Sequence, residues 1–194
     1  MTVSAGSVRV LVVAATEREL APLDGARTLA CGVGPVEAAA ATARALAQQR
    51  PDAVLHVGIA GAHGLPPLAL VLGSEAIYCD AAGPLVPART RPDGPLLERL
   101  RQAVPAAHVR PIGTSARVGG SSVGGSRADD GAAVEVEGME GFAVLRAAEL
   151  AGVPAVEARV ISNEIDEPNR ALWRFDDAFA RLAELLPRLV RAAQ

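Results

Sequence analysis

The sequence predicts an α/β protein with a central, mostly parallel sheet, and three observations support this fold class. Residues 8–14 and residues 53–59 form short continuous apolar runs, the pattern of strands that are buried on both faces. A long alanine-rich segment lies between them, so strand, helix and strand follow one another as in a parallel βαβ unit. Hydrophobic residues make up 50% of the 194 residues, which is enough for a single domain over residues 1–194 with its own core.

The elements of the first half follow from local patterns. A helix is expected to begin at Pro35, because proline is tolerated in the first helical turn, and to continue through V-E-A-A-A-A-T-A-R-A-L-A-Q-Q. A strand over 69–78, a helix over 94–104 and a strand over 110–118 come next. The run G-G-S-S-V-G-G at 119–125 has the composition of a linker but lies between predicted core elements, so we expect a mobile loop of the binding site.

The second half of the chain is predicted to contain a helix–strand unit and a closing helix. Residues 139–150 carry helix formers, and Gly152 followed by Val153-Pro154 is a stop signal before a buried strand over 154–161. Residues 175–193 form an amphipathic helix. Its apolar residues at helical spacing are Phe175, Phe179, Leu182, Leu185 and Leu186.

Polar groups stand at both ends of this helix–strand unit. Glu137 and Glu140 lie where the helix is expected to begin, and Ser162 and Asn163 lie where the strand ends. Ligands of open α/β sheets bind at the carboxyl ends of strands. The sequence therefore predicts a binding site formed by the two ends of the unit.

Composition excludes several classes of protein. The net charge is −3 and the arginines are scattered, which argues against a nucleic-acid surface. Lysine is absent, which excludes Schiff-base and P-loop chemistry. No apolar run approaches the roughly 20 residues that span a bilayer, and the N-terminus lacks a basic region before an apolar one. We therefore expect no membrane partner and a cytoplasmic location.

Cys31 and Cys79 lie far apart and show no metal-ligand spacing. Reduced, buried thiols are the expected state in a cytoplasmic protein. We expect neither a metal nor a cofactor.

The segment E-G-M-E-G-F-A, followed after a helix by R-V-I-S-N-E-I-D-E-P-N-R-A-L-W, resembles the nucleoside phosphorylase and nucleosidase superfamily. Within it, the chain is most similar to the futalosine hydrolases of the menaquinone pathway. The resemblance implies a three-layer α/β/α phosphorylase-like fold, hydrolysis of the N-glycosidic bond of futalosine with release of hypoxanthine, a small-molecule nucleoside as partner, and a homo-oligomer. The alternatives are a methylthioadenosine/adenosylhomocysteine nucleosidase and a non-catalytic nucleoside-binding module.

One departure from the family pattern lies between Glu19 and Cys31. Relatives place an extra strand pair there, and residues 20–29 are too few for it. This difference affects part of the site wall or an oligomer surface.

The resemblance assigns water activation to Glu19, in A-A-T-E-R-E-L after the first strand. A positioned carboxylate that accepts a proton from water contributes roughly 10²- to 10⁴-fold in rate. Glu17 in the same segment is the alternative base. As an isolated feature, Glu19 would be a solvated acid in a first helical turn, where the helix dipole favours it.

The resemblance assigns binding of the ribose to the M-E pair, Met139 and Glu140. Glu140 is expected to accept hydrogen bonds from the two ribose hydroxyls, with Met139 beneath the sugar. A carboxylate there also stabilises positive charge that develops on the sugar. Glu137 is the alternative ribose ligand, because V-E-V-E-G-M-E permits two registers. We favour Glu140.

Asn163 is the candidate that binds the base. Relatives that cleave adenine nucleosides carry aspartate here as a proton donor. Those that act on 6-oxopurines often carry asparagine, whose amide donates to the imidazole-ring nitrogen while its carbonyl accepts from a ring N–H. Ser162 is expected to orient this side chain. As a lone residue after a strand, an asparagine most often forms a turn.

Other candidates are weaker. Gly61, in G-I-A-G, is expected to let the backbone approach the ligand. Arg170 and Trp173 are expected to cover the distal end of the nucleoside, where futalosine carries an aromatic carboxylate, or else to pack before the last helix. His56 lies inside an apolar strand and is expected to be a satisfied core histidine.

Overall fold

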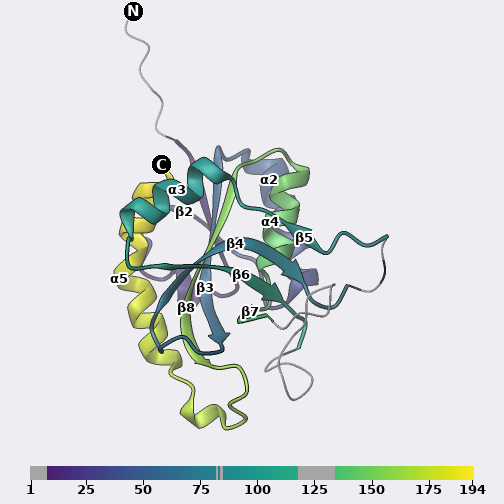
Figure 1. The fold of residues 1–194 in the computed structure, drawn as a ribbon. Coiled ribbons are helices and arrows are strands. Elements are labelled where there is room, and N and C mark those ends of the chain that lie inside the picture. The colour runs from purple at the N-terminus through teal and green to yellow at the C-terminus, as the bar shows by residue number, and fades with distance from the viewer. Residues whose placement is uncertain (1–7, 82, 84, 118–133) are drawn as a thin grey trace, which may run out of the picture.

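The computed structural model describes residues 8–81, 83, 85–117 and 134–194, and in this part of the chain eight strands form one mixed sheet (Figure 1). The strand order is β2-β1-β3-β7-β6-β4-β5, and β8 pairs with β3 and β4. The elements are β1 (Val10–Ala14), α1 (Glu17–Leu20), β2 (Arg27–Ala30), α2 (Pro35–Gln49), β3 (Ala53–Ala62), β4 (Leu70–Tyr78), β5 (Arg89–Thr90), α3 (Gly94–Ala103), β6 (His108–Thr114), β7 (Val136–Gly138), α4 (Gly141–Leu150), β8 (Ala155–Glu164), the 3₁₀ turn η1 (Arg170–Leu172) and α5 (Phe175–Ala193).

Helices cover both faces of the sheet, with α3 and α5 on one side and α2 and α4 on the other (Figure 1). Strand β1 shows why. Val10 and Val12 belong to the core beneath α3 and α5, whereas Leu11 and Val13 belong to the core beneath α2 and α4. Successive side chains of a strand point to opposite faces, so a continuous apolar run requires cover on both. The predicted three-layer α/β/α fold is confirmed.

The longer elements follow the sequence signals closely. Strands β1 and β3 pair in parallel with α2 between them, as the βαβ pattern predicted. Helix α2 begins at Pro35, and α5 has the predicted bounds. Asp93 starts α3 by accepting a hydrogen bond from the Leu96 amide at 2.8 Å.

Some boundaries differ from the predictions. Strand β3 extends to Ala62 rather than to residue 59, and β6 ends at Thr114 rather than at residue 118. The short strands β2, β5 and β7 were not predicted. Helix α4 begins at Gly141, so placing Glu137 at the helix start was wrong: Glu137 lies in β7, and Glu140 is the N-cap residue.

The predicted loop at residues 119–125 lies outside the described residues. Between the end of α1 at Leu20 and Cys31 the chain forms the single strand β2, which pairs in parallel with β1. Among the described helices, none combines the length and the apolar character needed to cross a membrane.

Candidate active site

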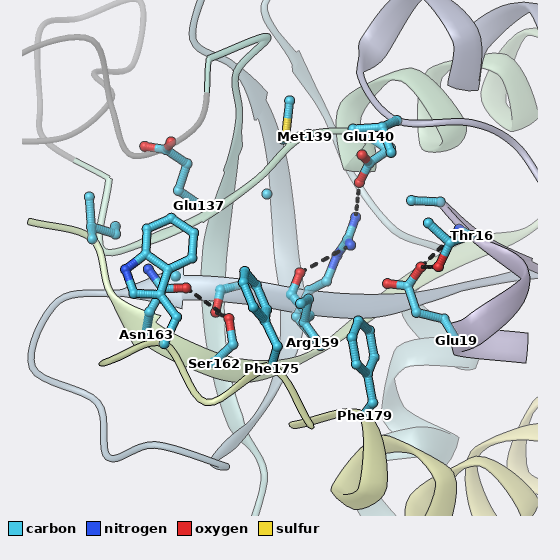
Figure 2. Close-up of a pocket in the computed structure, with 18 of the residues that line it drawn as sticks. Thr16, Glu19, Glu137, Met139, Glu140, Arg159, Ser162, Asn163, Phe175 and Phe179 are labelled. Atoms are coloured by element: carbon cyan, nitrogen blue, oxygen red, sulfur yellow. Dashed lines mark hydrogen bonds and ion pairs between the residues drawn. The ribbon is translucent and has the colours of Figure 1, made fainter. Parts of the chain in front are cut away.

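Strands β1, β3 and β8 run parallel, and polar residues at their carboxyl ends surround a cavity of about 330 Å³. Figure 2 shows Thr16 and Glu19 at one end, Ser162 and Asn163 at the other, and Arg159 with Glu140 between them. All the residues predicted from the sequence line this cavity: Glu19, Gly61, Met139, Glu140, Ser162, Asn163, Arg170 and Trp173.

Glu19 lies in the short helix α1, directly after β1, and is only 5% exposed. Its Oε2 accepts hydrogen bonds from the amide and from the hydroxyl of Thr16, at 2.9 and 2.8 Å. Burial raises the pKa of Glu19, and the positive charge of Arg159 opposes this effect. Glu17 is exposed and does not line the cavity, so the geometry favours Glu19 as a base.

Glu140 is held by two donors. Its Oε1 accepts from the Gly34 amide at 3.1 Å, and its Oε2 accepts from Arg159 Nη2 at 3.3 Å. An ionised carboxylate has about four lone-pair sites. Two of them therefore remain for a ligand with two neighbouring hydroxyl groups.

Arg159, which was not predicted as a site residue, is 1% exposed and lies under the centre of the cavity. Its Nε donates to Glu157 Oε1 at 2.8 Å, and its Nη2 contacts the Nε2 atom of His56. A signal for it existed in the sequence. Glu157 and Arg159 stand two residues apart in an apolar strand, so they share a face, and opposite charges on one buried face indicate an ion pair.

Gly58 makes room for this arginine, because a Cβ there would lie 2.4 Å from Arg159 Nη1. A Cβ at Gly138 would lie 3.5 Å from the guanidinium carbon, which is an ordinary contact distance. The glycine at position 58 in β3 therefore leaves space for a side chain of the site.

His56, which was predicted to be a satisfied core histidine, contacts the same arginine. His56 is fully buried, but its ring also supports Arg159.

The end of β8 is shaped by an irregularity in its pairing with β3. The register shifts at Gly61, so that Ile161 pairs with Ala60 and Asn163 pairs with Gly61. Such a bulge re-aims the side chains at a strand end. The Ser162 hydroxyl donates to Asn163 Oδ1 at 2.8 Å, and Asn163 Nδ2 donates to the Glu164 carbonyl at 2.9 Å.

Gly61 serves the side chain of Asn163. A Cβ at Gly61 would lie 3.0 Å from Asn163 Nδ2 and 3.2 Å from Ile165. Glu137 pairs with Gly61 from the other neighbouring strand and lines the cavity at 7% exposure. Glu137 and Glu140 are therefore both in the site, and Figure 2 shows Glu137 on the side of Asn163, away from Glu19.

Aromatic side chains form one wall. Phe175 and Phe179, predicted as part of the apolar face of α5, line the cavity together with Trp173. The Trp173 indole donates to the Glu167 carbonyl at 2.9 Å, and the guanidinium of Arg170 lies 5.5 Å from the Trp173 ring centroid. The Arg174 amide donates to the Ser162 carbonyl at 2.8 Å, which ties this segment to the site strand.

The arrangement combines a buried carboxylate, a second carboxylate with free acceptor sites, and an oriented amide. Such a set could serve hydrolysis of a bond between a sugar and a nitrogen base. One carboxylate could accept a proton from water, the other could bind the sugar hydroxyls, and the amide could stabilise the departing base. Among the described residues, no group of three or more His, Cys, Asp or Glu side chains is placed to hold a metal ion.

Comparison with known protein families and sequences gives matches over most of the chain. The family model of the phosphorylase superfamily matches residues 9–194. A futalosine hydrolase of Streptomyces coelicolor is 36% identical in an alignment 189 residues long, and the alignment covers 86% of this chain and 79% of that protein.

Solved structures are similar over nearly the whole chain. The 5'-methylthioadenosine/S-adenosylhomocysteine nucleosidase of Neisseria meningitidis, in complex with methylthio-immucillin-A, gives a TM-score of 0.79 at 25% identity and covers 94% of this chain and 98% of its own. A futalosine hydrolase mutant of Helicobacter pylori gives a TM-score of 0.81 at 16% identity, with the same coverage, which is a likeness of fold alone.

Proposed function

Because this chain belongs to the phosphorylase superfamily, we propose that it is a nucleosidase that hydrolyses the N-glycosidic bond of futalosine and releases hypoxanthine, as a step of menaquinone biosynthesis. Its similarity to the Streptomyces coelicolor enzyme supports the choice of substrate. The observation that carries the proposal is that Glu19, Glu140 and Asn163 line one cavity of about 330 Å³.

In the proposed reaction, Glu19 accepts a proton from a water molecule while the water oxygen attacks C1' of the ribose. The bond between C1' and the purine nitrogen breaks, and its electron pair leaves with the base. Positive charge that develops on the sugar is stabilised by Glu140, which also accepts hydrogen bonds from the two ribose hydroxyls. Met139 lies beneath the sugar.

At the base end, Asn163 donates a hydrogen bond to the imidazole-ring nitrogen of the departing purine. Its Oδ1 accepts from Ser162, and one N–H of Nδ2 is held by the Glu164 carbonyl, so the second N–H remains for the ligand. The amide stabilises the negative charge of the leaving group without a proton transfer. The anion then takes a proton from solvent to give the neutral base, and Glu19 releases its proton to solvent. Departure as an anion suits a 6-oxopurine, because its anion is more stable than that of adenine.

The distal end of futalosine carries an aromatic carboxylate. Trp173, Phe175 and Phe179 offer an aromatic wall for its ring, and Arg170 offers a cation at the exposed edge of that wall. A nucleoside without this distal group would leave the wall empty. The wall therefore favours futalosine over inosine.

The proposal is tested by incubating the purified protein with futalosine, inosine and methylthioadenosine, with and without phosphate, and measuring the free base and the sugar product. We expect hypoxanthine from futalosine to be released fastest and at a rate that phosphate does not change. Neither Gly32–Pro35 nor residues 58–64, at the end of β3, contain an arginine that would compensate a phosphate dianion. Faster cleavage of methylthioadenosine would favour the alternative nucleosidase, and a ribose-1-phosphate-type product would contradict hydrolysis.

We also propose a homo-oligomer in the cytoplasm. Val33 lines the cavity yet is 56% exposed, and Val36 beside it is 76% exposed. A second copy that covers this first turn of α2 would close the same side of the cavity. Cys31 is buried and forms no disulfide, which is in keeping with a reducing compartment. Light scattering of the wild type and of Val36→Glu tests the assembly, and a monomeric wild type would contradict it.

A further inference from the structure

A buried group of one arginine and three glutamates lies at the cavity, and only Glu157 among them does not line it. Arg159 is permanently cationic, and three carboxylates surround it, those of Glu19, Glu140 and Glu157. Glu157 Oε1 approaches the guanidinium most closely, at 2.8 Å, compared with 3.3 Å for Glu140 Oε2. Glu157 therefore supplies the nearest compensation of the arginine's charge. Burial raises the pKa of Glu157, and the charge and the hydrogen bond of Arg159 oppose this effect.

Glu157 has no access to a ligand. It is 0% exposed, it does not line the cavity, and a Cβ at Gly141 would lie 2.3 Å from its carboxylate oxygens. Among the described residues, its Oε2 has no hydrogen-bond partner. A buried ion pair with an unsatisfied oxygen is a poor way to stabilise a fold, because well-packed apolar side chains would do as well. Its presence beneath a reaction site points to a role in that site.

His56 completes the support from the neighbouring strand. His56 pairs in register with Glu157, and Gly58 pairs with Arg159, so these side chains share one face of the sheet. His56 Nδ1 donates to the Val13 carbonyl at 3.0 Å, which leaves the Nε2 lone pair to accept from Arg159 Nη2. Burial and the charge of Arg159 lower the pKa of His56, so its ring remains neutral.

We propose that Glu157 and His56 are positioning residues that hold the Arg159 guanidinium between Glu19 and Glu140, and that the charge of Glu157 offsets that of Arg159 so that Glu19 remains an effective base. This inference rests on the proposed function for its catalytic consequence. The geometric arrangement itself does not depend on the identity of the nucleoside.

The sign of the effect follows from the groups that face Glu19. These are the Thr16 donors, the Arg159 cation and the Glu140 anion; the nearby Cys31 thiol is neutral, since burial raises its pKa to about 12. A cation lowers the pKa of a nearby carboxylate. Without the negative charge of Glu157, the positive charge of Arg159 is less compensated and interacts more strongly with Glu19. The pKa of Glu19 then decreases, and Glu19 becomes a weaker base.

The main experiment compares wild type with Glu157→Gln, which keeps the side-chain shape and removes the charge. We expect the acidic limb of the kcat/KM profile to move to lower pH by roughly 0.5 to 1 unit, and kcat to fall roughly 10- to 100-fold with KM nearly unchanged. Glu149→Gln is the matched control. Glu149 lies near the end of α4, whereas Glu157 packs against Gly141 at its start, so removal of the Glu149 charge is expected to leave the acidic limb and kcat unchanged. An acidic limb that stays at the wild-type pH in Glu157→Gln overturns the proposal.

Two further variants separate charge from geometry. Glu157→Asp keeps the charge but withdraws the carboxylate, so we expect a lower kcat with an unmoved acidic limb. His56→Leu removes a neutral acceptor, and we expect the same result. If Glu157→Gln does not fold, Glu157→Asp decides the matter, and a wild-type kcat in that variant overturns the proposal.

A readout without turnover distinguishes failure of this inference from failure of the proposed function. The ¹³C carboxyl signal of Glu19, identified by its loss in Glu19→Gln, is titrated in wild type and in Glu157→Gln. The expected result is a lower midpoint in the variant, and identical midpoints overturn the inference. A wild type that releases no base from futalosine contradicts the proposed function and leaves this titration to decide the inference alone.

Discussion

The carboxylate of Glu19 and the guanidinium of Arg159 converge above Gly58 of β3. A Cβ built on Gly58 would lie 2.8 Å from Glu19 Oε1 and 2.4 Å from Arg159 Nη1. Real Cβ atoms do not approach other heavy atoms so closely, so glycine is required for both side chains to occupy these positions. Gly58 has no positive φ, which means that the requirement is one of space and not of backbone conformation.

Gly58→Ala is therefore expected to displace the proposed base and its neighbouring cation. Because a misplacement of about 1 Å can cost 10²-fold in rate, we expect kcat to fall on the order of 100-fold while the protein still folds. Gly94→Ala is the matched control, since a Cβ there would meet nothing within 4 Å. Turnover of futalosine and the thermal unfolding midpoint are the measurements. A Gly58→Ala variant with wild-type kcat would show that the convergence has no role in catalysis.

The longer elements could be predicted from the sequence because their signals are local. The bounds of α5 follow from its apolar spacing, and the start of α2 follows from Pro35. The three residues of β7 carry no such signal. They form a strand because β3 and β6 offer backbone partners on either side, and this pairing is a tertiary event.

The candidate site residues came from two sources. Local patterns place Glu140 and Asn163 at the ends of the helix–strand unit, whereas the choice of Glu19 depended on the resemblance to a known family. The support of Arg159 depends on the register of β8 against β3, which brings Glu157 beside His56, a residue about 100 positions earlier in the chain. Sequence spacing contains no information on that register. The contact between Arg159 and His56 could therefore be recognised only in the structure.

The pH dependence of activity should reflect the environment of Glu19. Burial is the largest influence and raises the pKa of Glu19 above its ordinary value. A general base acts only when deprotonated, so kcat/KM should fall as the pH decreases through this raised pKa. The Thr16 hydroxyl lowers the pKa by donating to Glu19, so Thr16→Val should move the acidic limb to higher pH by about 0.5 to 1 unit. A shift to lower pH would assign the limb to another group.

The two carboxylates of the E-G-M-E segment can be separated by their response to the ribose hydroxyls. Glu140→Gln should reduce both affinity and kcat, and it should weaken the preference for a ribonucleoside over its 2'-deoxy counterpart. Hydrogen bonds to a charged group contribute about 1.5–3 kcal/mol, or roughly 10- to 150-fold. Glu137→Gln should retain that preference, because Glu137 lies on the side of Asn163. The opposite outcome would make Glu137 the ribose ligand.

Arg170 is expected to affect futalosine but not inosine. The residue is exposed at η1, so its interaction with the distal carboxylate is screened by water and should be modest. We expect Arg170→Gln to raise KM for futalosine roughly 2- to 5-fold and to leave KM for inosine unchanged. Inosine is the internal control, because it lacks the distal group. An equal change for both nucleosides would indicate that Arg170 acts through packing against Trp173.

The last prediction concerns Asn163 and the identity of the base. The Asn163 amide donates to the Glu164 carbonyl at 2.9 Å and accepts from Ser162 at 2.8 Å, so its orientation is fixed from both sides. If it binds a 6-oxopurine, wild type should prefer 6-oxo nucleosides over 6-amino counterparts. A buried polar group left without its partner costs about 1–3 kcal/mol, which corresponds to roughly 5- to 150-fold in kcat/KM.

Asn163→Asp should shift this preference towards 6-amino nucleosides. The Glu164 carbonyl requires a donor, so an aspartate at this position is favoured in its protonated form, which can also carry a proton to a departing adenine. The relative kcat/KM for 6-amino substrates should rise, and an alkaline limb should appear in the variant because the new acid must stay protonated. Matched 6-oxo and 6-amino substrates measure the ratio. An unchanged ratio would mean that Asn163 does not discriminate the base, and the choice of futalosine as substrate would then rest on the overall similarity of the chain alone.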